Sequence, residues 1–128
     1  MHTVIEFLTY EDFIAEITGV APVVRVQAYY HTKPIGDMGE SVVYFVEAAA
    51  RREYPPQDEI YVVRFRIGSA WAFDDDQVEQ IRQKADKATE TLRHDLERRG
   101  FGVKPGLFAA TRDAGIITDP AFFDRTEV

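Results

Sequence analysis

The sequence of 128 residues contains no cysteine. This absence excludes disulfide bonds, thiolate zinc sites, iron–sulfur ligation and cysteine nucleophiles. Long apolar runs are also missing, because Glu47 interrupts the stretch Val42–Ala50, which is far shorter than a membrane span. The first residues have no basic lead of the kind that opens a signal peptide. We therefore expect a cytoplasmic protein that is neither secreted nor inserted in a membrane.

Positive charge is scarce. Lys and Arg together number 15 against 22 Asp and Glu, which gives a formal net charge of −7. An acidic domain repels a phosphate backbone unless its cations gather on one face, so we expect no nucleic-acid partner. Hydrophobic residues make up 45% of the chain, which is enough for a folded core, and no repeat or linker divides it. We predict a single domain over residues 1–128.

Patterns that would indicate catalysis or metal binding are missing as well. The three histidines do not pair with one another at the spacing of metal ligands. Serine occurs only at Ser41 and Ser69, without the glycines of a nucleophile elbow. No motif identifies a family. We therefore predict no catalytic residue, no metal and no cofactor, and we favour a protein without enzymatic activity.

Three runs with alternating or continuous apolar character predict β-strands, and they are Val23–His31, Ser41–Ala50 and Glu59–Ile67. Turn residues separate them: Gly36 and Gly39 in the first connection, and Pro55-Pro56 in the second. The first and third runs alternate, whereas the middle run is apolar on both faces except at Glu47. An antiparallel meander with the middle run at its centre is the simplest arrangement.

Two helices flank these strands. Thr9 is a candidate N-cap for a short helix, with Asp12 in its first turn, and Gly19 and Pro22 end it. The preceding Val4–Leu8 fits either a short strand or the start of this helix. A second, long helix is predicted from about Asp75 to Arg99 by an apolar stripe at spacings of three and four, consisting of Val78, Ile81, Ala85, Ala88, Leu92 and Leu96.

The end of the long helix and the segment after it also carry specific patterns. Gly100 stands where a C′ glycine is expected, and Phe101 beyond it predicts a Schellman-type end. Phe101–Ala110 fits an edge strand, since Pro105 would not suit a central one. Asp119-Pro120 is a candidate start for a final turn carrying Phe122 and Phe123.

Together these elements predict an α+β, two-layer fold: an antiparallel meander of three or more strands packed against a long C-terminal helix and a short N-terminal helix. One helical layer leaves the second apolar face of the middle strand, formed by Val43 and Phe45 or by their neighbours, uncovered. We expect either a partner subunit or a terminal segment of the chain to cover it.

Candidate ligand-binding residues fall into two groups. His31, Lys33, Asp37 and Glu40 belong to the first connection, a loop beside a strand end. Arg25, Arg64 and Arg66 share one sheet face if the strands register as expected, with Glu47 among them. Clustered arginines can hold a carboxylate or phosphate, but a cross-strand ion network with Glu47 is the simpler role.

These observations leave three hypotheses for function. The leading one is a small acidic, non-catalytic binding or assembly protein that self-associates through its sheet as a homodimer, or binds another protein. The second is a small-ligand-binding protein or enzyme with a site near residues 31–41. The third is an acidic inhibitor that mimics a nucleic acid.

Overall fold

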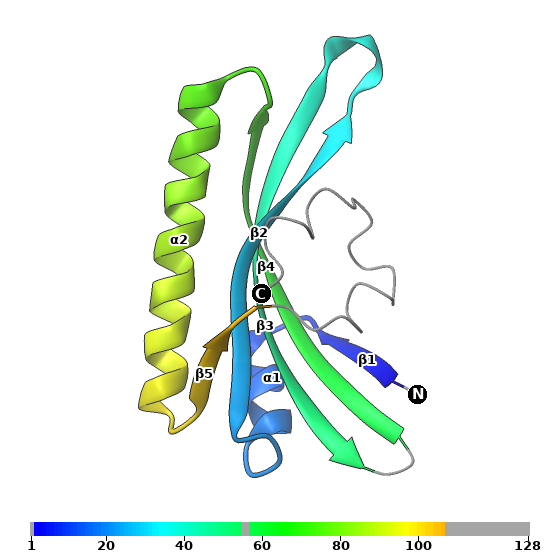
Figure 1. The fold of residues 1–128 in the computed structure, drawn as a ribbon, viewed down its shortest axis with the longest axis vertical. Helices are drawn as coiled ribbons and strands as arrows, with labels where there is room; N and C mark the ends of the chain where they lie inside the picture. Colours follow the sequence, from blue (N-terminus) through cyan, green and yellow to red (C-terminus); the bar gives the residue numbers. More distant parts are fainter. Residues whose placement is uncertain (1, 55–56, 107–128) are drawn as a thin grey trace.

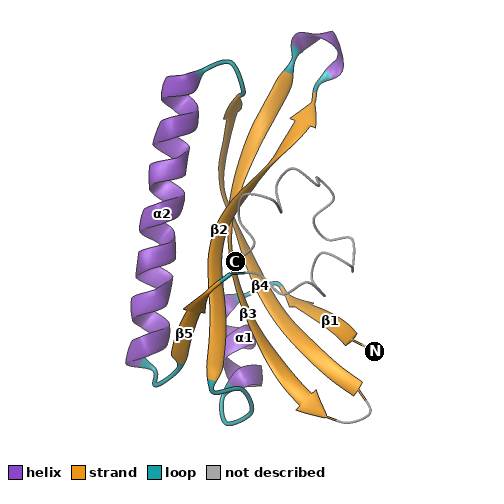
Figure 2. Cartoon of the chain, viewed as in Figure 1, coloured by secondary structure: helices purple, strands orange, loops and turns teal. Residues whose placement is uncertain are grey.

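The computed structural model describes residues 2–54 and 57–106, which form a five-stranded sheet with two helices on one face (Figures 1 and 2). The strand order across the sheet is β1-β4-β3-β2-β5. The elements in chain order are β1 (His2–Phe7), α1 (Tyr10–Ile17), β2 (Val23–Pro34), a 3₁₀ turn (Gly36–Met38), β3 (Glu40–Tyr54), β4 (Gln57–Trp71), α2 (Asp75–Arg98) and β5 (Gly102–Pro105).

The α+β prediction with a short N-terminal and a long C-terminal helix is confirmed, but the prediction of a purely antiparallel sheet is wrong. Strands β2, β3 and β4 form the expected antiparallel meander. The two edge strands pair in parallel, β1 with β4 and β5 with β2. The cause is the connection through a helix: α1 and α2 each return the chain to the end of the sheet where the preceding strand began, so the next strand runs in the same direction.

The meander strands extend further than their local patterns predict. The pairing of β2 with β3 continues without irregularity from Val24 opposite Ala50 to Pro34 opposite Glu40. The predicted connection from His31 to Ser41 is therefore mostly strand, closed by a short 3₁₀ turn. Within it, Gly39 has a φ of 106°, a conformation that favours glycine. The result is a long hairpin, whose tip lies at the top of Figure 1.

The start of α1 and the end of α2 follow the sequence patterns. The side chain of Thr9 accepts a hydrogen bond from the Asp12 amide and caps α1, and Val4–Leu8 resolves into β1 followed by an exposed Leu8. At the end of α2, the Phe101 amide donates to the Leu96 carbonyl and the Gly100 amide to the Glu97 carbonyl. These two bonds are the predicted Schellman arrangement.

The hydrophobic core lies between the helices and one face of the sheet. Phe13 and Ile17 of α1 and Leu96 of α2 are fully buried there. The strands contribute their alternate residues to the same side, and the buried ones are Val24, Val26, Val42, Tyr44, Val46, Ala48, Ala50, Tyr61 and Val63. The two helices also contact each other directly, because the Tyr10 hydroxyl donates to Asp95 Oδ2 at 2.6 Å.

The predicted edge strand after α2 is present as β5, which lies beside the start of β2. Pro105 sits at the sheet edge, where its missing amide proton costs no ladder hydrogen bond. The rest of the predicted strand, and the turn at Asp119-Pro120, fall outside the described residues. Within the described part of the chain, neither helix is long and apolar enough to cross a membrane.

Candidate functional site

Glu47 and Arg64 face each other at the centre of the sheet face that points away from the helices. Glu47 on β3 pairs with Arg64 on β4 and with Gln27 on β2. Arg64 Nη2 lies 3.5 Å from Glu47 Oε1, and its Nη1 lies 4.0 Å from Glu6 Oε1 on β1. The register also puts Arg25 and Arg66 on this face, as predicted. We call it the far face.

The Glu47 carboxyl is removed from water, since the residue is only 1% exposed. Burial raises its pKa from 4.5 to about 7, with Glu6 acting in the same direction, while Arg64 lowers it in part. Neither carboxylate oxygen takes part in a hydrogen bond with any described group. At 3.5 Å the contact with Arg64 is an ion pair that does not satisfy those oxygens. The residue is thus a buried acid with only partial compensation.

Aromatic side chains surround this pair. The ring of Tyr29 stacks on Phe45, with 5.4 Å between centroids, and the His31 ring lies 5.2 Å from Phe45. The Arg64 guanidinium lies 6.0 Å from the Tyr29 ring centroid. Burial raises the pKa of Tyr29, and the charge of Glu47 raises it further, so this phenol stays neutral at physiological pH.

The part of the far face next to Glu47 is apolar and closed to solvent. Ala49, Ile60 and Val62 form a small cluster in which no residue is more than 1% exposed, and Val4 of β1 packs against it. Val43 and Phe45, which lie on this face and are not covered by the helices, are half-buried.

The structure separates the predicted ligand-binding residues rather than gathering them around one cavity. His31 and Lys33 lie on the far face of β2, opposite Val43 and Ser41 of β3. Asp37 and Glu40 sit at the hairpin tip and are exposed. Of the arginines, Arg25 reaches the Pro105 carbonyl at 3.4 Å, Arg64 pairs with Glu47, and Arg66 donates to Ser69 Oγ at 3.1 Å.

The hairpin tip and the end of β4 together present exposed apolar side chains. Met38 and Ile35 are exposed in the tip, at 71% and 40%, and Phe73 after β4 is 74% exposed and stacks on Trp71 at 5.9 Å. The Ala72 amide donates to the Glu40 carbonyl at 2.8 Å, which holds the two segments together. We call Ile35, Met38, Trp71 and Phe73 the apolar end.

Carboxylates border the apolar end. They are Asp37, Glu40 and the three aspartates Asp74–Asp76, and Lys33 is the one cation among residues 33–41 and 71–77. Asp74 accepts a hydrogen bond from the Gln77 amide and caps α2, while Asp75 and Asp76 are exposed. This border is therefore strongly acidic.

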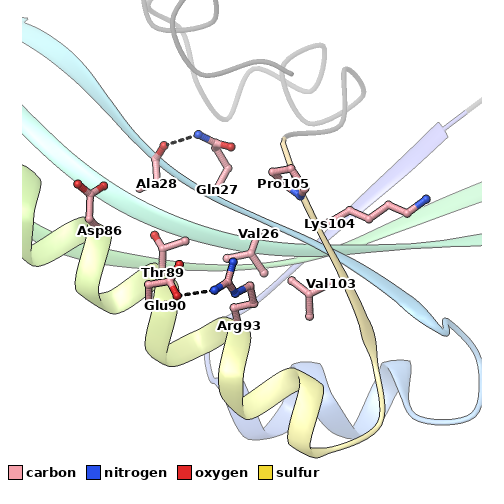
Figure 3. Close-up of a pocket in the computed structure, with 10 residues that line it drawn as sticks. All are labelled: Val26, Gln27, Ala28, Asp86, Thr89, Glu90, Arg93, Val103, Lys104 and Pro105. Carbon is pink, nitrogen blue, oxygen red and sulfur yellow. Dashed lines mark hydrogen bonds and ion pairs between the residues drawn. The ribbon is translucent and has the colours of Figure 1, made fainter.

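Cavities lined by described residues differ in chemistry, as a comparison of three of them shows. One of about 370 Å³ lies where β5 ends beside β2, with charged walls that include Asp86, Glu90 and Arg93 (Figure 3). There the Gln27 amide donates to the Ala28 carbonyl and Arg93 pairs with Glu90. A second cavity of about 420 Å³ lies between the turn after α1 and the end of α2. The third, of about 500 Å³, lies between the two helices and is mainly apolar.

Metal binding finds no support in residues 2–54 and 57–106, which contain no group of three or more potential ligands close enough to hold an ion. Comparisons of this chain with known protein families, with curated proteins and with solved structures gave no match.

Two features of the structure have only weak signals in the sequence. The sequence presents Glu47 as a counter-charge for the arginines, although an acid inside an apolar strand run is also a sign of costly burial. Met38 and Phe73 stand next to turn residues and match no motif, although large apolar side chains in a polar turn often indicate a contact surface.

Proposed function

We propose that this chain is a non-catalytic binding and assembly protein, and that the apolar end is its contact surface for another protein. The supporting observation is the clustering of exposed apolar side chains. Six large hydrophobic residues are exposed in the described part of the chain, and three of them, Ile35, Met38 and Phe73, lie at this end of the sheet. Scattered exposed hydrophobics are normal, whereas a cluster with a polar border is typical of an interaction site.

The composition of the apolar end suits protein binding. Aromatic residues and Met are enriched in the centres of protein interfaces, where they supply most of the binding energy. Met38 adapts to irregular surfaces because its side chain is unbranched and flexible. Strand pairing fixes the backbone on both sides of the patch, so a partner meets a surface that needs little ordering.

The charge of the border indicates the chemistry of the partner. Five carboxylates against one lysine favour a protein whose apolar contact area is bordered by Lys or Arg. A second copy of this chain docked end to end would instead bring two acidic borders together, which costs free energy. We therefore infer a different protein as the partner at this end.

Self-association through the sheet stays a prediction, and it involves the far face rather than the apolar end. The half-buried Val43 and Phe45 of the far face are the apolar residues that a second copy could cover.

The nucleic-acid-mimic hypothesis has less support, because the carboxylates of α2 alternate with arginines. Arg82 pairs with Glu79 and Asp86, and Arg93 with Glu90. A mimic needs a surface dominated by unpaired carboxylates.

Site-specific photo-crosslinking tests the proposal. Benzoylphenylalanine is placed at Phe73, and in a matched protein at Leu8, which is 97% exposed but lies elsewhere. We expect a discrete cross-linked product in cells from position 73 and not from position 8, and we expect Met38→Asp to abolish it. Products that are the same from both positions, or that survive Met38→Asp, would contradict the proposal. A product of twice the chain mass would identify a second copy as the occupant and overturn the inference of a different protein.

A further inference from the structure

We propose that the apolar cleft between α1 and α2 binds an uncharged, mainly apolar small molecule. The cleft has a volume of about 500 Å³, which lies within the range of small-molecule sites. Most of its walls are apolar or aromatic side chains, namely Tyr10, Val46, Phe65, Ile67, Ala88 and Leu92. It is separate from the apolar end, so it does not depend on the function proposed above.

The cleft exists because the two helices differ in length. Helix α1 has 8 residues and α2 has 24, and both pack on the same face of the sheet. Val63 on β4 is completely buried, whereas Phe65 and Ile67, the next residues of β4 on that face, are only half-buried. A groove floored by Val46, Phe65 and Ile67 therefore remains beside α2.

The end of the cleft at Tyr10 is fixed in place. The Tyr10 ring contacts Phe13 and Phe65, with centroids 6.5 and 6.1 Å away, and the Arg99 guanidinium lies 5.6 Å from it. Its hydroxyl donates to Asp95, which also binds Arg99 Nε at 2.7 Å. A wall held by this many contacts loses little freedom on binding, which favours affinity.

The charges around the cleft indicate what kind of molecule it accepts. Of the described residues that line it, only Asp95 is charged, and Tyr10, Arg98 and Arg99 already bind its carboxylate. A charged ligand would lose hydration without gaining a free counter-charge. The other walls are apolar or aromatic, with hydroxyl groups on Tyr10 and Thr91, and they suit a ring or branched chain with at most one polar group.

The charged cavity in Figure 3 is a contrasting case on the same helix. Asp86, Glu90, Arg93 and Lys104 line it, so an apolar molecule would have to displace water from charged groups there. An uncharged apolar molecule should therefore prefer the apolar cleft to this charged cavity.

The test uses the uncharged fluorescent probe N-phenyl-1-naphthylamine with the full-length protein. We expect saturable binding at one site, with a fluorescence increase that reports entry into an apolar environment. Ala88→Trp fills the cleft from α2 and should weaken binding on the order of tenfold or more, because an indole would occupy much of the volume. Lys87→Trp places the same side chain at the neighbouring exposed position and should leave the affinity unchanged.

Two outcomes would overturn the inference. One is an affinity of Ala88→Trp equal to that of the wild type, with circular dichroism showing both folded. The other is equally tight binding of the charged analogue 8-anilinonaphthalene-1-sulfonate, which would contradict the preference for uncharged molecules. Met38→Asp should leave probe binding unchanged, so failure here and failure of the proposed protein contact are distinguishable.

Discussion

The carboxylate of Glu47 lies 3.5 Å from the guanidinium of Arg64 across the β3–β4 pair, and the acid is almost completely buried. The hydrogen bonding of both residues is incomplete. Within the described structure, neither carboxylate oxygen of Glu47 has a hydrogen-bond partner, and Arg64 also has buried nitrogens without one. A buried ion pair with incomplete hydrogen bonding gives little net stability, while removing one partner leaves an uncompensated charge. The two residues therefore make stability depend on pH and on each other.

Stability should fall as pH rises through neutrality. The pKa of Glu47 is raised in the folded state from 4.5 to about 7, so the folded protein binds this proton more tightly than the unfolded chain does. The contribution of this proton to the free energy of unfolding is complete below about pH 4.5 and is lost as pH rises through 7. The loss is on the order of 3 kcal/mol. Urea unfolding at about pH 5 and pH 8 measures this. Glu47→Gln should flatten the difference, and equal stability of the wild type at both pH values would contradict the assignment.

Removal of Arg64 should be most harmful at high pH. Arg64→Met removes the cation that favours the charged form of Glu47, so at pH 8 the buried acid either lacks a counter-charge or must take up a proton. We expect this to cost about 3 kcal/mol at pH 8, and less at pH 5, where Glu47 is already protonated. The double variant Glu47→Gln with Arg64→Met should recover part of that loss in the same urea experiment. Arg82→Met, which breaks an exposed ion pair on α2, serves as the control and should change stability much less. Additive effects of the two far-face substitutions would exclude coupling between them.

The sequence predicts those features that depend on local patterns. The apolar stripe of α2 and its ending at Gly100 are visible because a helix repeats every 3.6 residues and ends with recognisable groups. Alternation in the meander strands likewise assigns Arg25, Arg64 and Arg66 to one face.

Features that depend on how elements meet could not be predicted. Parallel pairing of β1 with β4 depends on where α1 returns the chain, and no local pattern encodes that. The interhelical cleft follows from the positions of two helices of different length on one sheet. Burial of Glu47 also depends on its surroundings, since the same alternation would fit an exposed ion network.

The contact between the two helices should contribute measurably to stability. Tyr10→Phe keeps the ring but removes the hydroxyl that donates to Asp95 at 2.6 Å, and we expect a loss of about 1 kcal/mol. The Tyr10 hydroxyl is the largest cause of the low pKa of Asp95, followed by Arg99. The stability from Asp95 is present above its ordinary pKa of 3.8 and is lost as pH falls through the lowered value. The stability of the variant should therefore also be less sensitive to acid, which acid-unfolding curves measure. A curve equal to that of the wild type would show that the Tyr10 hydroxyl does not lower the pKa of Asp95.

A comparison of two glycines tests what shapes the hairpin tip. Gly39 has a φ of 106° and open space where a Cβ would lie, so Gly39→Ala costs free energy only through backbone conformation. We expect a loss of about 1–2 kcal/mol in thermal or urea unfolding. Gly68→Ala is the matched control, since that residue is not at positive φ and an added methyl would meet Ile81 at an ordinary 3.6 Å. If the tip also positions Met38 for a partner, Gly39→Ala should weaken cross-linking at Phe73 while Gly68→Ala does not. Equal effects of the two substitutions would show that the positive φ at Gly39 is unimportant to the apolar end.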